Sequence, residues 1–254
     1  MVGIAGILLA VSSCFVKEDR DLCPGRLILD FSSVDTSVVE SLYVLIADSK
    51  GNLFSGMVTS DEFAQDYIME VPRGETRINI WNIADYVMTR EGGLTIPYGC
   101  ECPCLYMDSF VTHVKGDMVR ETVEIHKNYC MLTILVEGME SIPYSFTLEG
   151  NVSGYGFDGL PAVGDFSCVA YPGGGKGEVC VSLPRQIDDS LLLGLEDDNG
   201  NIKTFAVGEY MRTSGYDWNA PDLEDVTVII DYYITSVSIK IQGWDEEYVY
   251  DIVL

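Results

Sequence analysis

The sequence predicts an all-β protein made of two tandem β-sandwich domains. Segments rich in β-branched and aromatic residues alternate between apolar and polar positions, as strands with one buried face do. Turn residues separate these segments about every eight to twelve positions, a spacing typical of sandwiches. The apolar fraction of 47% is large enough to build a core, despite a formal charge of −25.

The first half of the chain carries seven segments with strand patterns. Two turn sequences, D-S-K-G-N after Ala47 and P-R-G-E after Val71, indicate hairpins. A single helical turn is expected at 60–66. The predicted strands are 26–31, 41–47, 53–54, 66–71, 76–83, 111–115 and 119–127.

The second half continues the same pattern, and its densest β-branched run is V-T-V-I-I-D-Y-Y-I, which starts at Val226. The glycine-rich stretch 151–164 is expected to be a loop. The predicted strands are 129–138, 142–150, 166–171, 179–183, 191–195, 202–207, 226–234, 237–242 and 248–254.

The chain start predicts a lipoprotein signal. Val2 to Val11 is an apolar run that is too short to span a bilayer but has the length of a signal-peptide core. It ends in V-S-S-C, which resembles a bacterial lipobox, with Cys14 as the residue that receives the lipid. The alternative is a buried N-terminal strand or helix. No basic residue precedes the run, which indicates a start codon assigned too late.

The residues after Cys14 form a polar tether. Lys17, Glu18 and Asp19 resemble the export signal that sends lipoproteins of Bacteroidota to the outer leaflet of the outer membrane. We therefore divide the chain into a signal peptide (1–13), a tether (14–25) and two sandwiches (26–127 and 128–254). This predicts a surface-exposed, lipid-anchored protein of the outer membrane.

Charge excludes some partners. Residues 14–127 hold 19 acidic against 10 basic residues, and residues 128–254 hold 21 against 5. Such an excess of negative charge repels phosphate backbones and anionic headgroups, so we expect no nucleic-acid binding.

Catalysis is not expected either. The chain has only two histidines, His113 and His126, and no nucleophile-elbow, zinc-protease or phosphate-loop motif. Pro172 to Glu178 and Glu196 to Gly200 resemble a phosphate loop and a calcium loop in composition alone. We predict no enzymatic activity, no metal site and no cofactor.

The cysteines leave alternatives open. Cys100, Cys102 and Cys104 lie in G-C-E-C-P-C, where a zinc site, a local disulfide and free thiols are all compatible with the spacing. Free thiols or a local disulfide are the favoured interpretation. Cys130, Cys168 and Cys180 alternate with apolar residues, so we interpret all three as small core side chains.

Several of these segments resemble FimB-type fimbrial subunits, the lipoprotein anchors of type V fimbriae in Bacteroidales. The resemblance lies in Cys14 with its acidic tether and in four segments. These are D-L-C-P-G-R-L-I-L-D-F (21–31), Y-V-L-I-A-D-S-K-G-N-L (43–53), V-P-R-G-E-T-R-I-N-I-W-N (71–82) and V-S-I-K-I-Q-G-W-D-E-E-Y-V (237–249). Thr76 stands where the family more often has an aromatic residue.

The resemblance implies two transthyretin-like or Ig-like sandwiches and a basal anchor that attaches the fimbrial shaft and limits its length. It also implies contact with fimbrillin shaft subunits by strand exchange or at a sheet edge. The C-terminal segment 249–254 is either such an exchanged strand or, as we favour, a strand that closes its own sheet.

An alternative function from another class is a surface carbohydrate-binding or adhesin-like lipoprotein. Tryptophan rings are common platforms for sugars, and the chain has three, Trp81, Trp218 and Trp244. Trp218 lies in the polar context Y-D-W-N-A-P-D and is the best candidate for a glycan platform. Core packing is the competing interpretation for each of the three.

Overall fold

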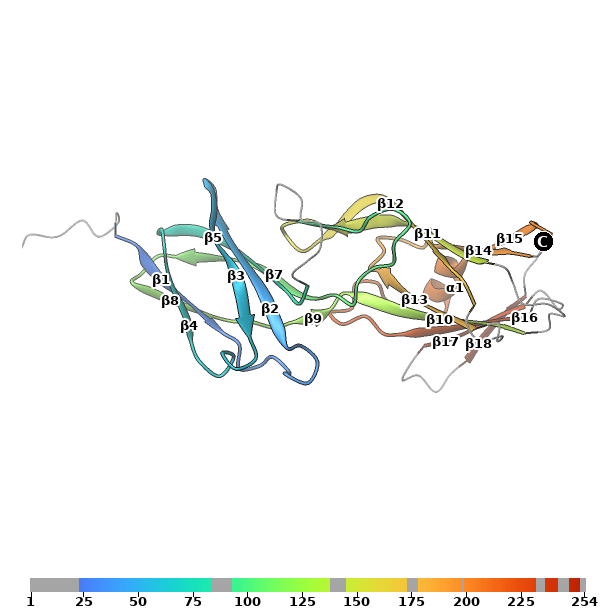
Figure 1. The fold of residues 1–254 in the computed structure, drawn as a ribbon, viewed down its shortest axis with the longest axis horizontal. Helices are drawn as coiled ribbons and strands as arrows, with labels where there is room; N and C mark the ends of the chain where they lie inside the picture. Colours follow the sequence, from blue (N-terminus) through green and yellow to red (C-terminus); the bar gives the residue numbers. More distant parts are fainter. Residues whose placement is uncertain are drawn as a thin grey trace, which may run out of the picture.

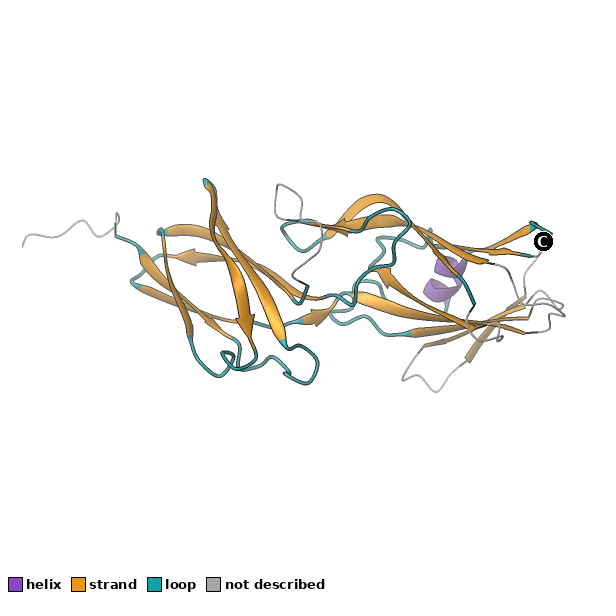
Figure 2. Ribbon diagram, viewed as in Figure 1, coloured by secondary structure: helices purple, strands orange, loops and turns teal. Residues whose placement is uncertain are grey.

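Four β-sheets form two sandwiches that lie end to end along the long axis of the molecule (Figure 1). The computed structural model describes residues 23–83, 93–137, 145–172, 178–197, 199–231, 236–241 and 247–251. Almost every element in these ranges is a strand, with one short helix in the C-terminal sandwich (Figure 2). The prediction of an all-β fold with two sandwiches is confirmed.

The N-terminal sandwich contains a three-stranded and a five-stranded sheet. Sheet A has the order β4 (Tyr67–Val71), β1 (Gly25–Asp30), β8 (Met118–Thr122). Sheet B has the order β3 (Gly51–Thr59), β2 (Ser41–Asp48), β5 (Gly74–Trp81), β7 (Tyr106–Val114), β9 (His126–Lys127).

The C-terminal sandwich contains sheets C and D. Sheet C has the order β12 (Pro161–Ala170), β11 (Ser145–Tyr155), β14 (Leu192–Glu196), β15 (Ile202–Phe205), and β6 (Leu94–Thr95) also pairs with β11. Sheet D has the order β13 (Glu178–Pro184), β10 (Tyr129–Glu137), β16 (Val226–Asp231), β17 (Ser236–Ile241), β18 (Glu247–Asp251).

The two sandwiches place their first strands alike. β1 lies between an antiparallel neighbour, β4, and a parallel one, β8. β10 likewise lies between antiparallel β13 and parallel β16. A parallel partner must be reached by a long crossover, so each first strand is paired with a strand far along the chain.

The N-terminal core is aliphatic and lies between sheets A and B. In β2 the period of two sends Leu42, Val44 and Ile46 into this core, and Leu45 to the opposite face. The buried members of the N-terminal core are Leu27, Leu29, Phe31, Val39, Leu42, Val44, Ile46, Val58, Phe63, Val71, Ile78, Ile80, Val114 and Val123.

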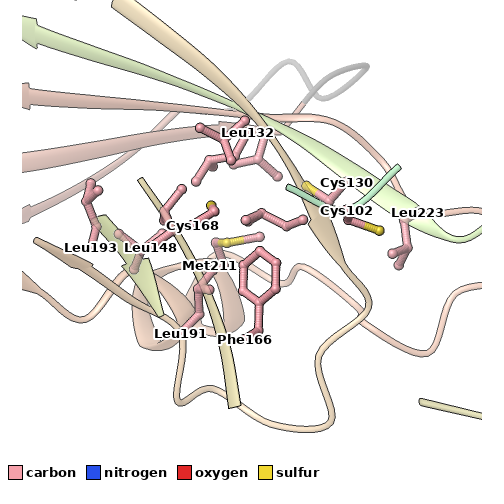
Figure 3. Packing of buried hydrophobic residues seen from close by; sticks show 14 of the residues in the cluster. Cys102, Cys130, Leu132, Leu148, Phe166, Cys168, Leu191, Leu193, Met211 and Leu223 are labelled. Atoms are coloured by element: carbon pink, nitrogen blue, oxygen red, sulfur yellow. The ribbon is translucent and has the colours of Figure 1, made fainter. Parts of the chain in front are cut away.

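The C-terminal core lies between sheets C and D and also holds the helix α1 (Val207–Thr213). Figure 3 shows part of it, with Met211 of α1 among side chains of both sheets. Met211 and Val207 are four residues apart on one helical face, and both are fully buried. The sequence pattern did not predict this helix, because two helical turns are too short to show a period of 3.6 next to strand patterns.

Residues 93–105, here called the strap, run from the N-terminal half onto the C-terminal sandwich. Its backbone N–H groups at Ile96, Gly99 and Cys102 donate to carbonyl oxygens of Ser153 (2.8 Å), Ser167 (2.8 Å) and Ser182 (3.0 Å). The strap therefore joins β11 and β12 of sheet C to β13 of sheet D. The domain boundary after Lys127 stays a prediction. The strap precedes this boundary in the sequence, but it packs against the sandwich that follows the boundary.

The expectation of a loop at 151–164 is wrong. β11 continues through Gly154 to Tyr155, β12 begins at Pro161, and only the tip between them is irregular. A Cβ atom at Gly154 would lie 2.0 Å from the carbonyl oxygen of Leu94, so glycine here lets β6 approach the strand. A glycine in this stretch allows two backbone segments to approach closely. A glycine-rich sequence looks the same whether it forms such a strand or a loop, so the sequence alone did not distinguish the two. The residues at 60–66 form hydrogen-bonded turns rather than a helical turn.

Candidate functional site

The predicted lipid attachment point and export signal cannot be placed. Cys14, Lys17, Glu18 and Asp19 lie outside the described residues. Their roles stay predictions. Within the described part of the chain, the structure contains no helix of the length and hydropathy needed to cross a membrane.

The described chain begins at a well-anchored point. Arg73, in the turn before β5, donates from Nε to the carbonyl oxygen of Cys23 (3.0 Å) and from Nη1 to that of Lys115 (3.1 Å). Its Nη2 forms an ion pair with Asp117 at 2.7 Å. The guanidinium thus fixes the chain where it enters the sandwich, at the end of the molecule farthest from the C-terminal sandwich (Figure 1).

Trp218 does not present a ring face to solvent. Its side chain is 6% exposed and packs edge-on against Tyr216 with ring centroids 4.7 Å apart. Its Nε1 is buried without a hydrogen-bond partner among the described residues. The prediction of a glycan platform at Trp218 is therefore wrong, because the residue belongs to the C-terminal core. A polar sequence context did not predict the burial, since only the fold brings Arg185, whose Nη1 donates to the Trp218 carbonyl oxygen, to this segment.

Core packing also accounts for Trp81, which is 5% exposed and packs against Tyr43 at 5.3 Å between ring centroids. Trp244 lies outside the described residues. None of the tryptophans in the described ranges is available as a platform for a ligand.

The described cysteines are all free thiols. Burial raises the pKa of Cys130 and of Cys168 to about 12, so both stay protonated and pack as small apolar groups. Cys180 is exposed, and the prediction that it is a core side chain is wrong. In G-C-E-C-P-C, Cys102 is buried and its two neighbours in the motif are exposed. Among the described residues, no three His, Cys, Asp or Glu side chains are arranged to hold a metal ion.

The tip of the β11–β12 hairpin packs against sheet B and joins the two sandwiches. The side chain of Asn79, 1% exposed on β5, donates to the carbonyl oxygen of Phe157 at 2.7 Å. Ser109 of β7 hydrogen-bonds to the Asn79 side chain. Gly159 has φ of +74°, and a Cβ atom there would lie 2.6 Å from Ser109 Cβ. Glycine is needed here for both its conformation and the close approach.

Beside this contact, a cleft of about 430 Å³ opens between the sandwiches. Asp108 and His126 contribute from sheet B, and Leu160 and Ile187 form apolar parts of the opposite wall. Burial raises the pKa of Asp108, although its carboxylate accepts a hydrogen bond from the N–H of Glu124 at 2.9 Å. The cleft could hold a small polar group, because Asp108, Ser109 and His126 all line it. Nδ1 of His126 lies 3.3 Å from Oδ2 of Asp222, so this histidine already has a carboxylate partner.

Arg185 holds the far wall of the cleft together. Its guanidinium donates to the carbonyl oxygens of Trp218, Ala220 (2.7 Å) and Pro221 (3.1 Å), and to Oδ1 of Asn128 (3.2 Å). Desolvation lowers the pKa of Arg185, but the ring of oxygen acceptors satisfies its donors. Its hydrogen bonds are used to fix a loop, so the arginine has a structural role.

Comparisons with known proteins give the fold a context. No protein-family model matches the chain, and no curated protein matches it. Several solved structures are similar to the chain. One is a candidate polysaccharide-binding protein from Bacteroides thetaiotaomicron, with a TM-score of 0.64, 14% identity, and coverage of 91% of this chain and 98% of that one.

Two further structures are similar over both sandwiches. The fimbrial anchor protein Mfa2 from Porphyromonas gingivalis has a TM-score of 0.60 and 15% identity, with coverage of 87% of this chain and 98% of that one. A candidate adhesin from Bacteroides thetaiotaomicron has a TM-score of 0.57 and 16% identity, with coverage of 87% and 97%. The chain therefore shares its two-sandwich fold with these proteins.

Proposed function

We propose that this chain is a surface-exposed lipoprotein subunit of a bacterial fimbria, held in the outer membrane by Cys14 and acting as the anchor at the base of the shaft. The observation that carries the proposal is the likeness to the fimbrial anchor Mfa2, which extends over 87% of this chain and 98% of that one. The predicted lipobox before the first sandwich supports it independently, because lipidation of Cys14 would supply the attachment that an anchor needs.

The arrangement of the sandwiches fits this role. The chain enters at the free end of the N-terminal sandwich, where Arg73 holds the carbonyl oxygen of Cys23. A lipid on Cys14 would therefore sit at one end of an elongated molecule and the C-terminal sandwich at the other. The C-terminal half has 21 acidic against 5 basic residues, and such a charge suits a part that projects away from an anionic membrane surface.

Shaft subunits would meet the C-terminal sandwich at its sheet edges, by edge contact or strand exchange. β15 is the last strand in the order of sheet C and β18 is the last in that of sheet D, so each is an edge strand of the described chain. Ile202 on β15 is 66% exposed and Val249 on β18 is 65% exposed. β18 pairs along its length with β17, which supports our interpretation that the C-terminal segment 249–254 closes its own sheet, although residues 252–254 lie outside the described ones.

We propose no catalytic activity and no cofactor for this protein. The polar groups of the cleft at the junction are engaged in structural contacts: Ser109 hydrogen-bonds to Asn79, His126 pairs with Asp222, and Arg185 donates to oxygen acceptors. The alternative of a glycan binder that uses Trp218 is not proposed again, because that ring is buried.

The decisive experiment replaces the predicted lipid acceptor. In cells that carry Cys14→Ala, we expect the protein to leave the membrane fraction and fimbriae to be detached or overlong. Cys23→Ala is the matched control, since Cys23 is an exposed free thiol close to the same end and should have no effect. Membrane fractionation and electron microscopy provide the readout. Membrane-bound protein and normal fimbriae in the Cys14→Ala strain would overturn the proposal.

A further inference from the structure

We propose a carbohydrate-binding site on the outer face of sheet C, where the ring of Tyr98 and the carboxylates of Glu149 and Asp165 border a hollow. The hollow has a volume of about 290 Å³ and is completed by Gly150, Phe166 and Ser167. This inference goes beyond the proposed anchoring role and does not depend on it.

Tyr98 supplies an aromatic face on a fixed backbone. Its side chain is 74% exposed, although the residues on either side are tied to sheet C. The N–H of Ile96 donates to Ser153 and that of Gly99 to Ser167, both at 2.8 Å. Ile96 itself is 3% exposed and anchors the strap in the core. A large ring held in water by a rigid segment is ready to stack on a ligand with little loss of conformational entropy.

The two carboxylates come from neighbouring strands. Glu149 on β11 pairs with Ser167 on β12, and the next pair is Gly150 with Phe166. The register then shifts to Val152 with Val163, so β12 has two residues, Gly164 and Asp165, where β11 has one. This β-bulge lies at the rim of the hollow. Bulges re-aim side chains, and here the bulge sets the position of Asp165 beside the hollow.

Both carboxylates are free to accept hydrogen bonds. Within the described ranges, the ion pairs and side-chain hydrogen bonds involve neither Glu149 nor Asp165, and both residues are exposed. An ionised carboxylate has about four acceptor positions and no donor, so it seeks ligands rich in hydroxyl or N–H donors.

A neutral polyhydroxylated ligand fits this set of groups. Its C–H face can stack on the ring of Tyr98, because the aromatic face carries negative charge density. Its hydroxyl groups can donate to Glu149 and Asp165. Phosphorylated or carboxylated ligands would be repelled by the same two groups and by the formal charge of −25. The combination of an aromatic wall and a few convergent polar groups is typical of small-molecule sites.

The sheet face beside the hollow leaves room for an extended glycan. Thr147 lies between Val169 on β12 and Gly194 on β14. Gly194 has no side chain, and a Cβ atom there would lie 3.7 Å from that of Thr147. Thr147 can therefore offer its hydroxyl to a second sugar unit on this face. A stack on one ring plus hydrogen bonds along a sheet favours an oligosaccharide over a monosaccharide.

The test is a glycan array probed with the labelled full-length chain. One set of spots carries bacterial cell-surface polysaccharides and the other carries host oligosaccharides, so the array identifies the source of the ligand. We expect binding to neutral glycans, and a loss of at least about tenfold in affinity for Tyr98→Ala, the effect of removing about 1.4 kcal/mol or more of stacking energy. Glu149→Gln and Asp165→Asn are expected to weaken binding less.

Tyr171→Ala is the matched control, because Tyr171 is 64% exposed, directly follows β12 of the same sheet and does not border the hollow. Its affinity should equal that of the wild type. Thermal unfolding of each variant shows that the sandwich is intact. Absence of binding to every neutral glycan by the wild-type chain would overturn the proposal, as would Tyr98→Ala binding with unchanged affinity. Fimbriae should assemble normally in the Tyr98→Ala strain, which separates this site from the anchoring role.

Discussion

The two sandwiches resemble each other in topology and differ in what fills them. In each, the first strand lies between an antiparallel and a parallel neighbour. The N-terminal core uses only residues between Leu27 and Val123, all within its own sandwich. The C-terminal core also takes in residues from the first half of the chain, namely Leu45, Trp81, Leu94, Ile96, Cys102, Leu105 and Met107.

This difference shows that the division by sequence and the division by packing do not coincide. The strap crosses from one half to the other, and the β11–β12 hairpin returns the contact by packing on sheet B. The C-terminal sandwich therefore depends on residues that precede it, whereas the N-terminal core is closed.

Leu105→Ala should remove a fully buried side chain of the strap and leave a cavity in the C-terminal core. We expect the free energy of unfolding to fall by about 2–5 kcal/mol. Leu42→Ala makes the equivalent change in the N-terminal core. Hydrogen exchange measured by mass spectrometry should show loosened sheets C and D for Leu105→Ala, and loosened sheets A and B for Leu42→Ala. Loosening of sheets A and B alone by Leu105→Ala would show that the strap does not stabilise the C-terminal core.

Gly159→Ala should weaken the contact between the hairpin tip and sheet B. Gly159 and Gly200 have φ of +74° and +80°, but only Gly159 has a neighbour, Ser109, in the way of a Cβ atom. Both variants carry the backbone strain of about 1–2 kcal/mol, and Gly159→Ala should cost about 1–3 kcal/mol more from overpacking.

Denaturant unfolding gives the free-energy difference between the Gly159→Ala and Gly200→Ala variants, and small-angle X-ray scattering reports whether the sandwiches change their relative position. Equal costs for the two variants would mean that the junction tolerates the extra atom.

Ionisation of two carboxyl groups, Asp108 and Asp66, should change the free energy of unfolding in opposite directions. Burial raises the pKa of Asp108 at the junction above its ordinary value of about 3.9. Ionisation of this carboxyl therefore favours the unfolded chain. The free energy of unfolding should fall as the pH rises from the ordinary pKa through the pKa of the folded protein. Hydrogen bonding to Arg120 lowers the pKa of Asp66 on the N-terminal sandwich. That stabilisation is present above the ordinary value and is lost as pH falls through the folded one.

Asp108→Asn should therefore stabilise the protein at pH 7 relative to the wild type and lose that advantage at pH 3. Arg120→Gln should destabilise it at pH 7 and have less effect at pH 3. Denaturant unfolding across pH 3–8 checks both variants. A wild-type advantage over Asp108→Asn at pH 7 would show that ionised Asp108 makes a favourable contact in the junction.

The smallest effects are expected at two buried hydroxyl groups, one in each sandwich. Thr76 and Ser182 are at most 3% exposed, and their hydroxyl oxygens have no hydrogen-bond partner among the described residues. Thr76→Val and Ser182→Ala remove an unsatisfied polar atom, so each should leave stability unchanged or raise it by up to about 1 kcal/mol. A loss of more than this amount for Ser182→Ala alone, measured by thermal unfolding, would show that the C-terminal core satisfies its polar groups differently.

The sequence alone was sufficient to predict the all-β class, the two sandwiches and most strands. These features depend on local alternation, and the alternation in T-R-I-N-I-W is visible without any partner strand. The lipoprotein signal at Cys14 stays a prediction of the sequence, because Cys14 lies outside the described residues; such a signal is local, since the export machinery recognises it before the chain folds.

Only the tertiary structure decided which side chains are available to a ligand. Trp218 has a polar sequence context and is buried. Tyr98 has no sequence signal for a binding residue, and its ring is exposed beside two carboxylates. It also decided that the strap belongs to the C-terminal core and that the glycines at 150–156 lie in or beside a strand. Exposure and close backbone approach depend on contacts between residues far apart in the chain, and a local pattern carries no information about those contacts.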